Sequence, residues 1–193
     1  MHSSCFDRQS LFTDRFLVID IQNDYFPGGA MELAGGSEAG VQAARLLQVY
    51  RQKSLPVIHI QHISTRKGAT FFLPNTKGVQ FHESVTPAEG ETVIQKNYPN
   101  SFRETRLFEH LREHQVSQLV IAGMMTHMCI DTTTRAAADL GFHCVLAHDA
   151  CATRALSFGG AIVSAENVQT AFLAALGGLF AKVVSVEEIC ASL

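Results

Sequence analysis

The chain has 193 residues, of which 47% are hydrophobic, and its formal net charge is -3 at pH 7. This length provides one sizeable core and is short for two, so we expect a single domain over residues 1–193. Acidic and basic residues are mixed along the chain, and no basic stripe or polybasic cluster is present. Nucleic acid and membrane partners are therefore not expected.

The N-terminal segment does not look like a secretory signal. Residues 1–16 lack a basic start, a continuous apolar stretch and a small-residue cleavage site, and no apolar run reaches membrane-spanning length. We therefore expect a cytoplasmic protein. The cysteines form no C-x-x-C pair, which argues against a disulfide scaffold and against a thiolate zinc site. They are Cys5, Cys129, Cys144, Cys151 and Cys190.

Short runs rich in Val and Ile alternate with amphipathic stretches, a pattern typical of an α/β fold with a parallel sheet and helical crossovers. In chain order we expect a strand at 16–20, a helix at 37–54, a strand at 56–61, a strand at 92–96, a helix at 102–115, a strand at 118–123, a helix at 126–140, a strand at 143–147, a helix at 164–176 and a strand at 182–186. Ser101-Phe102-Arg103-Glu104 reads as a capping box for the second helix. Residues 63–90 show no clear period, which predicts a long and functional loop.

Three reactive side chains fall at the carboxyl ends of predicted strands. Asp20 ends the first strand, Lys96 ends the third, and the loop after the fourth leads to Cys129 at the start of a helix. Ligands of open parallel sheets bind at this edge, so we expect an acid, an ammonium group and a nucleophile to meet there. The helix N-terminus and Lys96 would both favour the thiolate. Each of these three residues, considered alone, could have an ordinary structural role. The other cysteines are expected to be packing or surface thiols.

Ordered motifs along nearly the whole chain resemble the isochorismatase-like cysteine hydrolases, the superfamily of nicotinamidases, N-carbamoyl amide hydrolases and isochorismatases. The motifs are FLVIDIQNDYF, VIQKNYPNSF, LVIAGMMTHMCIDTTTRAAADLGF, DACAT and AENVQTAFLAAL. The resemblance implies a six-stranded parallel sheet with helices on both faces and a triad of Asp20, Lys96 and Cys129. It also implies a cis peptide between Met124 and Met125, and an oxyanion hole formed by the backbone N–H groups of Met125 and Cys129.

The activity implied by this resemblance is hydrolysis of a small-molecule amide or related C–N bond through a thioester, with no cofactor. Isochorismatases that cleave a vinyl ether can work without a cysteine, so the presence of Cys129 favours C–N chemistry. Vinyl ether hydrolysis is the alternative within enzymes. A binding or redox-sensing relative that keeps a reactive thiol is the alternative outside enzymes.

Nicotinamidases of this superfamily carry an Asp and several His residues as a metal site after the second strand. Here that segment lacks an Asp-x-His pair, and His59 and His62 lie three apart on a strand, so they point to opposite faces. We therefore expect no metal. His62 and Tyr25 are candidates for contact with substrate. His110 and His114 match an H-x-x-E-H zinc pattern, but they lie toward the far end of their helix, where a solvated charged face is the better explanation.

Two further features have structural interpretations. Asp149 follows the fifth strand and is expected to hold a loop. The apolar stretch at 171–180 suits either core or interface. Relatives commonly form symmetric oligomers, so a homo-oligomer is expected.

Overall fold

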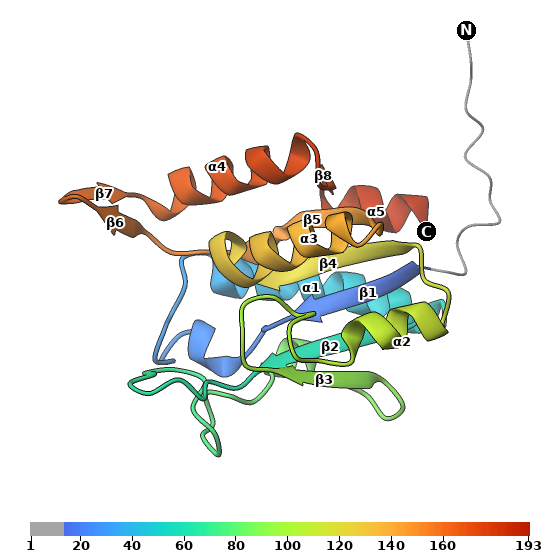
Figure 1. The fold of residues 1–193 in the computed structure, drawn as a ribbon, viewed down its shortest axis with the longest axis horizontal. Coiled ribbons are helices and arrows are strands. Elements are labelled where there is room, and N and C mark those ends of the chain that lie inside the picture. The colour runs from blue at the N-terminus through green and yellow to red at the C-terminus, as the bar shows by residue number, and fades with distance from the viewer. Residues whose placement is uncertain (1–13) are drawn as a thin grey trace, which may run out of the picture.

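The structure is a computed structural model that describes residues 14–193, so Cys5 lies outside the described residues. Its centre is an all-parallel sheet of six strands in the order β3-β2-β1-β4-β5-β8 (Figure 1). A separate antiparallel hairpin is formed by β6 and β7. Among residues 14–193, no helix has both the length and the apolar character needed to cross a membrane.

The elements follow one another in the alternating order that the sequence predicts. The strands are β1 (Asp14–Ile19), β2 (Val57–His62), β3 (Thr92–Lys96), β4 (Gln118–Met124), β5 (His143–Ala152), β6 (Leu156–Phe158), β7 (Ala161–Val163) and β8 (Lys182–Val184). The helices are α1 (Gly36–Gln52), α2 (Leu107–Glu113), α3 (Asp131–Asp139), α4 (Ala165–Gly177) and α5 (Val186–Ser192).

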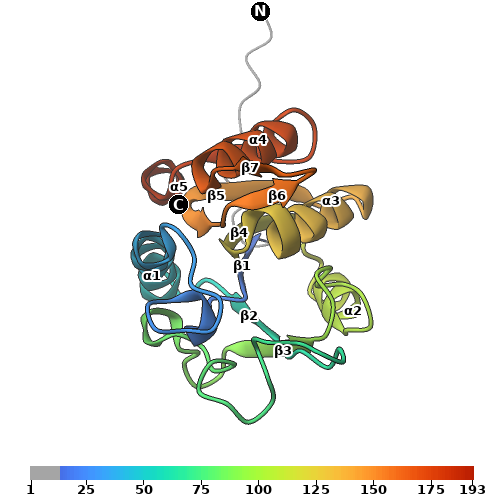
Figure 2. The ribbon, with the colours of Figure 1, turned by 90° about the vertical axis from the view of Figure 1, so that its left-hand side faces the viewer.

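Helices cover both faces of the sheet, as expected. Successive residues of a strand point to opposite faces, so Phe16 and Val18 belong to one buried cluster and Leu17 and Ile19 to another. The first cluster includes residues of α1 and α5, and the second includes residues of α2, α3 and α4. Figure 2 shows α1 and α5 on one side of the sheet and α2 and α3 on the other.

The second helix begins five residues later than predicted, at Leu107. The proposed capping box is wrong, because the Ser101 hydroxyl is buried and pairs with Thr133 Oγ1 at 2.9 Å instead of capping a helix. Glu104 has a φ of 56°, which is incompatible with a continuous helix. Residues 101–106 form turns that connect the end of β3 to α2.

The C-terminal region contains elements that the sequence analysis did not identify. The last strand ends at Val184, and Ser185 caps α5 through a capping box with Glu188. The helix has only seven residues and so gives little periodic signal, although its S-x-x-E spacing was readable. The β6–β7 hairpin was also missed, and it projects away from the sheet (Figure 1).

The long segment at 63–90 contains no strand, as expected, and its only helical element is a 3₁₀ turn at Glu83–Val85. Backbone hydrogen bonds attach it to the chain that follows β1: Asn23 N donates to Gln80 O, Asp24 N donates to Gly78 O and His82 N donates to Ile21 O, each at 3.0 Å. The segment is therefore held beside the carboxyl end of the central strand.

Candidate active site

The strand order places the predicted reactive groups at one edge. The strand order reverses between β1 and β4: β2 and β3 follow on one side of β1, and β4, β5 and β8 follow on the other. Such a switch point leaves a crevice at the carboxyl ends of the strands. Asp20 follows β1, and Cys129 follows β4. Lys96 ends β3 and pairs in register with His62, the last residue of β2. Side chains from four adjacent strand ends therefore converge.

Asp20 and Lys96 form a buried ion pair in which Lys96 Nζ lies 2.7 Å from Asp20 Oδ2. Burial raises the pKa of Asp20, but the Lys96 ammonium and His62 outweigh burial and lower this pKa overall. Burial lowers the pKa of Lys96, but the Asp20 carboxylate and Cys129 outweigh it and raise this pKa overall. Each group thus favours the charged form of the other, and the pair is ionised at neutral pH.

The Cys129 sulfur is buried next to this pair. Its Sγ atom lies 4.0 Å from His62 Nδ1, and sulfur, carboxylate oxygen and ring nitrogen all lie within 4.8 Å of one another. Burial raises the pKa of Cys129 and the Asp20 carboxylate raises it further, while Lys96 lowers it only in part. Burial and Asp20 therefore outweigh the influence of Lys96, and the thiol form of Cys129 is favoured. The site holds a thiol beside a carboxylate that can accept its proton.

The backbone before Cys129 has two unusual features. The peptide bond between Met124 and Met125 is cis. Gly123 has a φ of 139°, and a Cβ atom at this position would overlap the Ile19 carbonyl oxygen. The close approach of β4 to β1 therefore requires glycine here. After Met125 the chain forms a π-helical turn at Thr126–Ile130, which carries Cys129 into α3.

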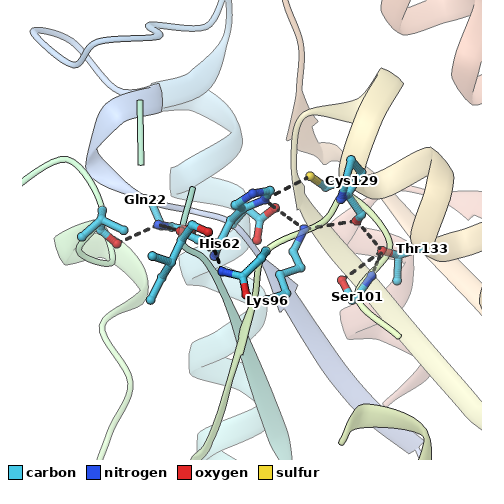
Figure 3. Close-up of polar contacts among 11 residues, drawn as sticks. Gln22, His62, Lys96, Ser101, Cys129 and Thr133 are labelled. Carbon is cyan, nitrogen blue, oxygen red and sulfur yellow. Dashed lines mark hydrogen bonds and ion pairs between the residues drawn. The ribbon is translucent and has the colours of Figure 1, made fainter. Parts of the chain in front are cut away.

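Lys96 is held from its other side by a hydroxyl network that the sequence analysis missed (Figure 3). Its Nζ donates to Pro99 O at 3.1 Å, and Thr133 Oγ1 of α3 donates to the same carbonyl oxygen at 3.3 Å. Ser101 N donates to Thr133 Oγ1 at 3.1 Å. Since Thr133 lies about one helical turn after Cys129, this network connects the Lys96 ammonium to the helix that follows Cys129.

His62 is fixed by Gln22, a second residue that sequence reasoning missed (Figure 3). The fully buried Gln22 amide donates to His62 O at 2.9 Å and to Val79 O at 2.7 Å, and its Oε1 accepts from His62 N at 2.8 Å. The His62 ring then lies with Nδ1 3.8 Å from Asp20 Oδ2. The only signal for Gln22 was its place two residues after Asp20.

Tyr25 lies in an aromatic cluster beside the site. Its ring packs on Phe71 and Phe72, with ring centroids 5.9 and 4.6 Å apart, and Phe72 also contacts the His62 ring. Burial raises the pKa of Tyr25 well above its ordinary value, with Cys129 and Asp20 adding to the effect. Asp24 fixes the cluster, because its carboxylate accepts from Phe72 N at 2.6 Å. Contact of Tyr25 and His62 with substrate stays a prediction.

Comparison with known proteins identifies the family. The family model described as the isochorismatase domain matches residues 15–188. The chain belongs to the isochorismatase family. It is 51% identical over 175 residues to the isochorismatase family protein YddQ of Bacillus subtilis (strain 168), which covers 91% of this chain and 97% of YddQ. A crystal structure from Oleispira antarctica, assigned to the isochorismatase hydrolases, superposes with a TM-score of 0.90 at 45% identity and covers 99% of both chains.

Other isochorismatase-family relatives differ in the reactions that their names state. The secreted isochorismatase effector Isc1 of Verticillium dahliae is 32% identical over 173 residues, covering 90% of this chain and 88% of Isc1. The maleamate amidohydrolase of Pseudomonas putida is 30% identical over 152 residues, covering 72% of this chain and 71% of that enzyme. A streptothricin hydrolase of Streptomyces noursei is 33% identical over 144 residues, covering 71% of this chain and 49% of that enzyme.

The histidines of this isochorismatase-family chain occupy different environments. His59 is buried with its Nε2 2.8 Å from Glu91 Oε2, whereas His62 faces Asp20 and Cys129, so the two do not share one site. At the end of α2, the rings of His110 and His114 pack on each other with centroids 4.3 Å apart. Within residues 14–193, the one group of three residues with metal-ligand spacing is Asp20, His62 and Cys129, which sequence reasoning did not identify.

The remaining predicted positions have structural roles. Asp149 lies on β5, and its Oδ1 accepts a hydrogen bond from Val186 N at 2.8 Å, so it holds the start of α5. Cys144 and Cys151 are buried and Cys190 is partly buried, all as free thiols. Cys144 and Cys190 lie on β5 and α5, whereas Cys151 is near the carboxyl end of β5 and pairs in register with Gly123.

Proposed function

We propose that this isochorismatase-family hydrolase cleaves a small-molecule amide or related C–N bond through a thioester on Cys129. The observation that carries the proposal is the meeting of the Asp20 carboxylate, the Lys96 ammonium and the Cys129 thiol inside the protein, with Lys96 Nζ 2.7 Å from Asp20 and the sulfur within 4.8 Å of that carboxylate. The relative named maleamate amidohydrolase supports the same class of bond, and the relative named streptothricin hydrolase supports hydrolysis of a small molecule.

In the first half of the reaction, Asp20 takes the thiol proton while Sγ attacks the carbonyl carbon. The S–C bond forms, and the carbonyl electron pair moves onto oxygen. Backbone N–H groups of Met125 and Cys129 hold this oxyanion, a type of contact worth about 10²- to 10³-fold in rate per donor. Collapse breaks the C–N bond, and the leaving nitrogen receives the proton from Asp20.

In the second half, water attacks the thioester. Asp20 accepts a proton from that water, the C–S bond breaks, and Asp20 returns this proton to the sulfur as the acid product leaves. Lys96 stays charged throughout and keeps Asp20 ionised between the two proton transfers. His62, at the end of β2, and Tyr25, in the chain that follows β1, contact the substrate. Every step draws on protein groups and water alone.

The test of this proposal is trapping of the acyl group. A panel of primary amides, N-carbamoyl amino acids and lactams, together with isochorismate, is incubated with wild-type protein, and intact mass is measured after rapid acid quenching. A turned-over amide should add its acyl mass to the chain, and peptide mapping should place that mass on Cys129. Cys129→Ala should lose both adduct and turnover, whereas Cys190→Ser, which removes a thiol outside the site, should keep both.

Three results would contradict the proposal. Equal turnover by Cys129→Ala and wild type would remove the nucleophile from the reaction. Turnover of isochorismate alone, without an adduct, would indicate vinyl ether hydrolysis. Tight binding of a panel compound with neither turnover nor adduct would indicate a binding protein that keeps the fold.

A further inference from the structure

Asp20, His62 and Cys129 bring three kinds of metal-ligand atom into one small volume. His62 Nδ1 lies 3.8 Å from Asp20 Oδ2 and 4.0 Å from Cys129 Sγ, and all three ligand atoms lie within 4.8 Å of one another. Zn²⁺ binds sulfur at about 2.3 Å and nitrogen or oxygen at about 2.0–2.2 Å in a tetrahedron, which places neighbouring donors roughly 3.5 Å apart. The two His62 separations are close to this requirement.

Two further observations favour a cation at this place. Asp20 Oδ1 is buried and accepts no hydrogen bond from any residue in 14–193, while the Lys96 contact is made at Oδ2. The His62 separation is measured to Oδ2, the oxygen that Lys96 also contacts, while Oδ1 gives the same carboxylate a second oxygen for a positively charged partner. His62 is already fixed by the Gln22 hydrogen bonds to its backbone N and O, so its ring needs little reorganisation to act as a ligand.

We propose that Asp20, His62 and Cys129 form an inhibitory Zn²⁺ site, in which these three side chains bind the ion and water fills the fourth position. Binding replaces the Cys129 S–H bond by an S–Zn bond, and the thiol proton passes to the buffer without any change of oxidation state. A bound ion occupies the sulfur and the carboxylate together. The inhibitory effect rests on the proposed function, whereas the binding itself does not.

The Lys96 ammonium opposes this site, because it brings a like charge to the same carboxylate at 2.7 Å. Lys96 therefore weakens Zn²⁺ binding, and its removal leaves an unpaired buried carboxylate that a cation can neutralise. We expect Lys96→Ala to bind Zn²⁺ at least as tightly as wild type although its turnover is lost. This variant separates the metal site from the hydrolytic function.

The experiment measures binding of Zn²⁺ alone to the full chain by competition with a chromophoric chelator, with circular dichroism as the check on folding. His62→Ala and Cys129→Ala should each weaken the affinity more than about 100-fold, since loss of even an outer partner of a metal ligand costs 10- to 100-fold. His114→Ala, which breaks the pattern on α2, and Cys190→Ser should bind like wild type. Co²⁺ in place of Zn²⁺ should give a thiolate charge-transfer band that is absent in Cys129→Ala.

The Zn²⁺-binding measurements can either support or overturn the proposed site. The proposal is overturned if wild-type protein does not bind Zn²⁺, if His62→Ala or Cys129→Ala binds as tightly as wild type, or if His114→Ala loses the binding. Zn²⁺ binding with the expected variant pattern supports the site even if no amide in the panel is hydrolysed. Where hydrolysis is observed, Zn²⁺ should inhibit it and a chelator should restore it.

Discussion

At the scale of single residues, the carboxylate of Asp20 lies next to both the Lys96 ammonium and the Cys129 thiol. Asp20 faces the Lys96 ammonium at 2.7 Å and has the Cys129 sulfur within 4.8 Å. Asp20 adopts a φ of 53°, which is uncommon for a residue other than glycine and directs the chain out of β1. Such backbone conformations persist where the surrounding structure holds them, and they occur often at functional sites.

The charge state of this pair predicts the pH profile of the reaction. Because Lys96 holds the pKa of Asp20 below its ordinary value of 3.8, the acid limb of kcat/KM should lie below that pH. Because Asp20 holds the pKa of Lys96 above 10.5, the alkaline limb should lie above that pH. Steady-state kinetics with the trapped substrate should therefore give a flat profile from about pH 5 to 9.

The Cys190→Ser variant should give the same flat profile. An acid limb near neutral pH that belongs to the free enzyme and persists in His62→Ala would show that Asp20 is not the base that takes the thiol proton.

At the scale of elements, a polar network ties α1 to the sheet. Arg51 of α1 donates to both oxygens of Glu91 at 2.8 Å, and His59 of β2 lies 2.8 Å from Glu91 Oε2. The hydrogen bonds from Arg51 lower the pKa of Glu91 to about 2, against the opposing effect of burial. A folded-state pKa below the ordinary value of 4.5 contributes stability above pH 4.5, and this contribution is lost as the pH falls toward 2.

Glu91→Gln should therefore lower the free energy of unfolding by about 1 to 3 kcal/mol at pH 7, because it removes a charge-assisted, bidentate contact. The difference from wild type should shrink as the pH falls from 4.5 toward 2. Urea unfolding at several pH values measures both effects. Glu89→Gln, at an exposed position two residues away, should change neither, and a pH-independent difference for Glu91→Gln would contradict the linkage.

The contact between β1 and β4 predicts a second effect. Gly123→Ala places a methyl group against the Ile19 carbonyl at a φ of 139°, so we expect a loss of more than about 2 kcal/mol of stability and a loss of turnover. Gly177→Ala in α4, where a Cβ meets only ordinary contacts, should be neutral or slightly stabilising. Thermal unfolding compares the two, and equal melting temperatures would contradict the close approach of the strands.

Sequence analysis located the strands and helices that have a clear apolar periodicity. It missed features that depend on contacts between residues far apart in the chain. The parallel strands and the convergence of Asp20, Lys96 and Cys129 follow from apolar periodicity and from the rule for strand ends. The late start of α2 could not be read, because Ser101 is engaged by Thr133, 32 residues further along the chain. The protonation of the resting thiol also depends on burial, which a local pattern does not report.

At the scale of the whole molecule, exposed apolar side chains lie at both ends of α4, on the hairpin that precedes it and in the turn that follows it. Phe158 and Ile162 of the β6–β7 hairpin are 90% and 79% exposed, and Leu179 after α4 is 84% exposed. In the stretch at 171–180, Leu176 is buried in the core while Leu179 is not, so the stretch divides between core and surface. An isolated two-stranded hairpin is marginally stable in water, which favours its burial against another surface.

The homo-oligomer expected from the sequence stays a prediction, and the hairpin gives a place to test it. We expect the wild-type chain to form a dimer or a larger symmetric assembly, and Phe158→Ser combined with Ile162→Ser to lower its mass in size-exclusion chromatography with light scattering. Val41→Ser, at an exposed apolar position on α1, should leave the mass unchanged. A monomeric wild-type chain at micromolar concentration would contradict the expectation.

The pairing of His62 with Lys96 has a consequence for how this scaffold can acquire new specificities. The segment at 63–90 begins beside the carboxyl end of β3, where Ile63 N donates to Lys96 O at 2.9 Å and Asn97 Nδ2 donates to Ile63 O at 2.7 Å, and the chain then returns to the sheet at the opposite, amino end of β3. Its length and composition can therefore change without displacing the ammonium group, which is set by strand register. Replacing the segment at 63–90 by that of a homologue should therefore alter the range of substrates, while the side chains at the strand ends stay in place.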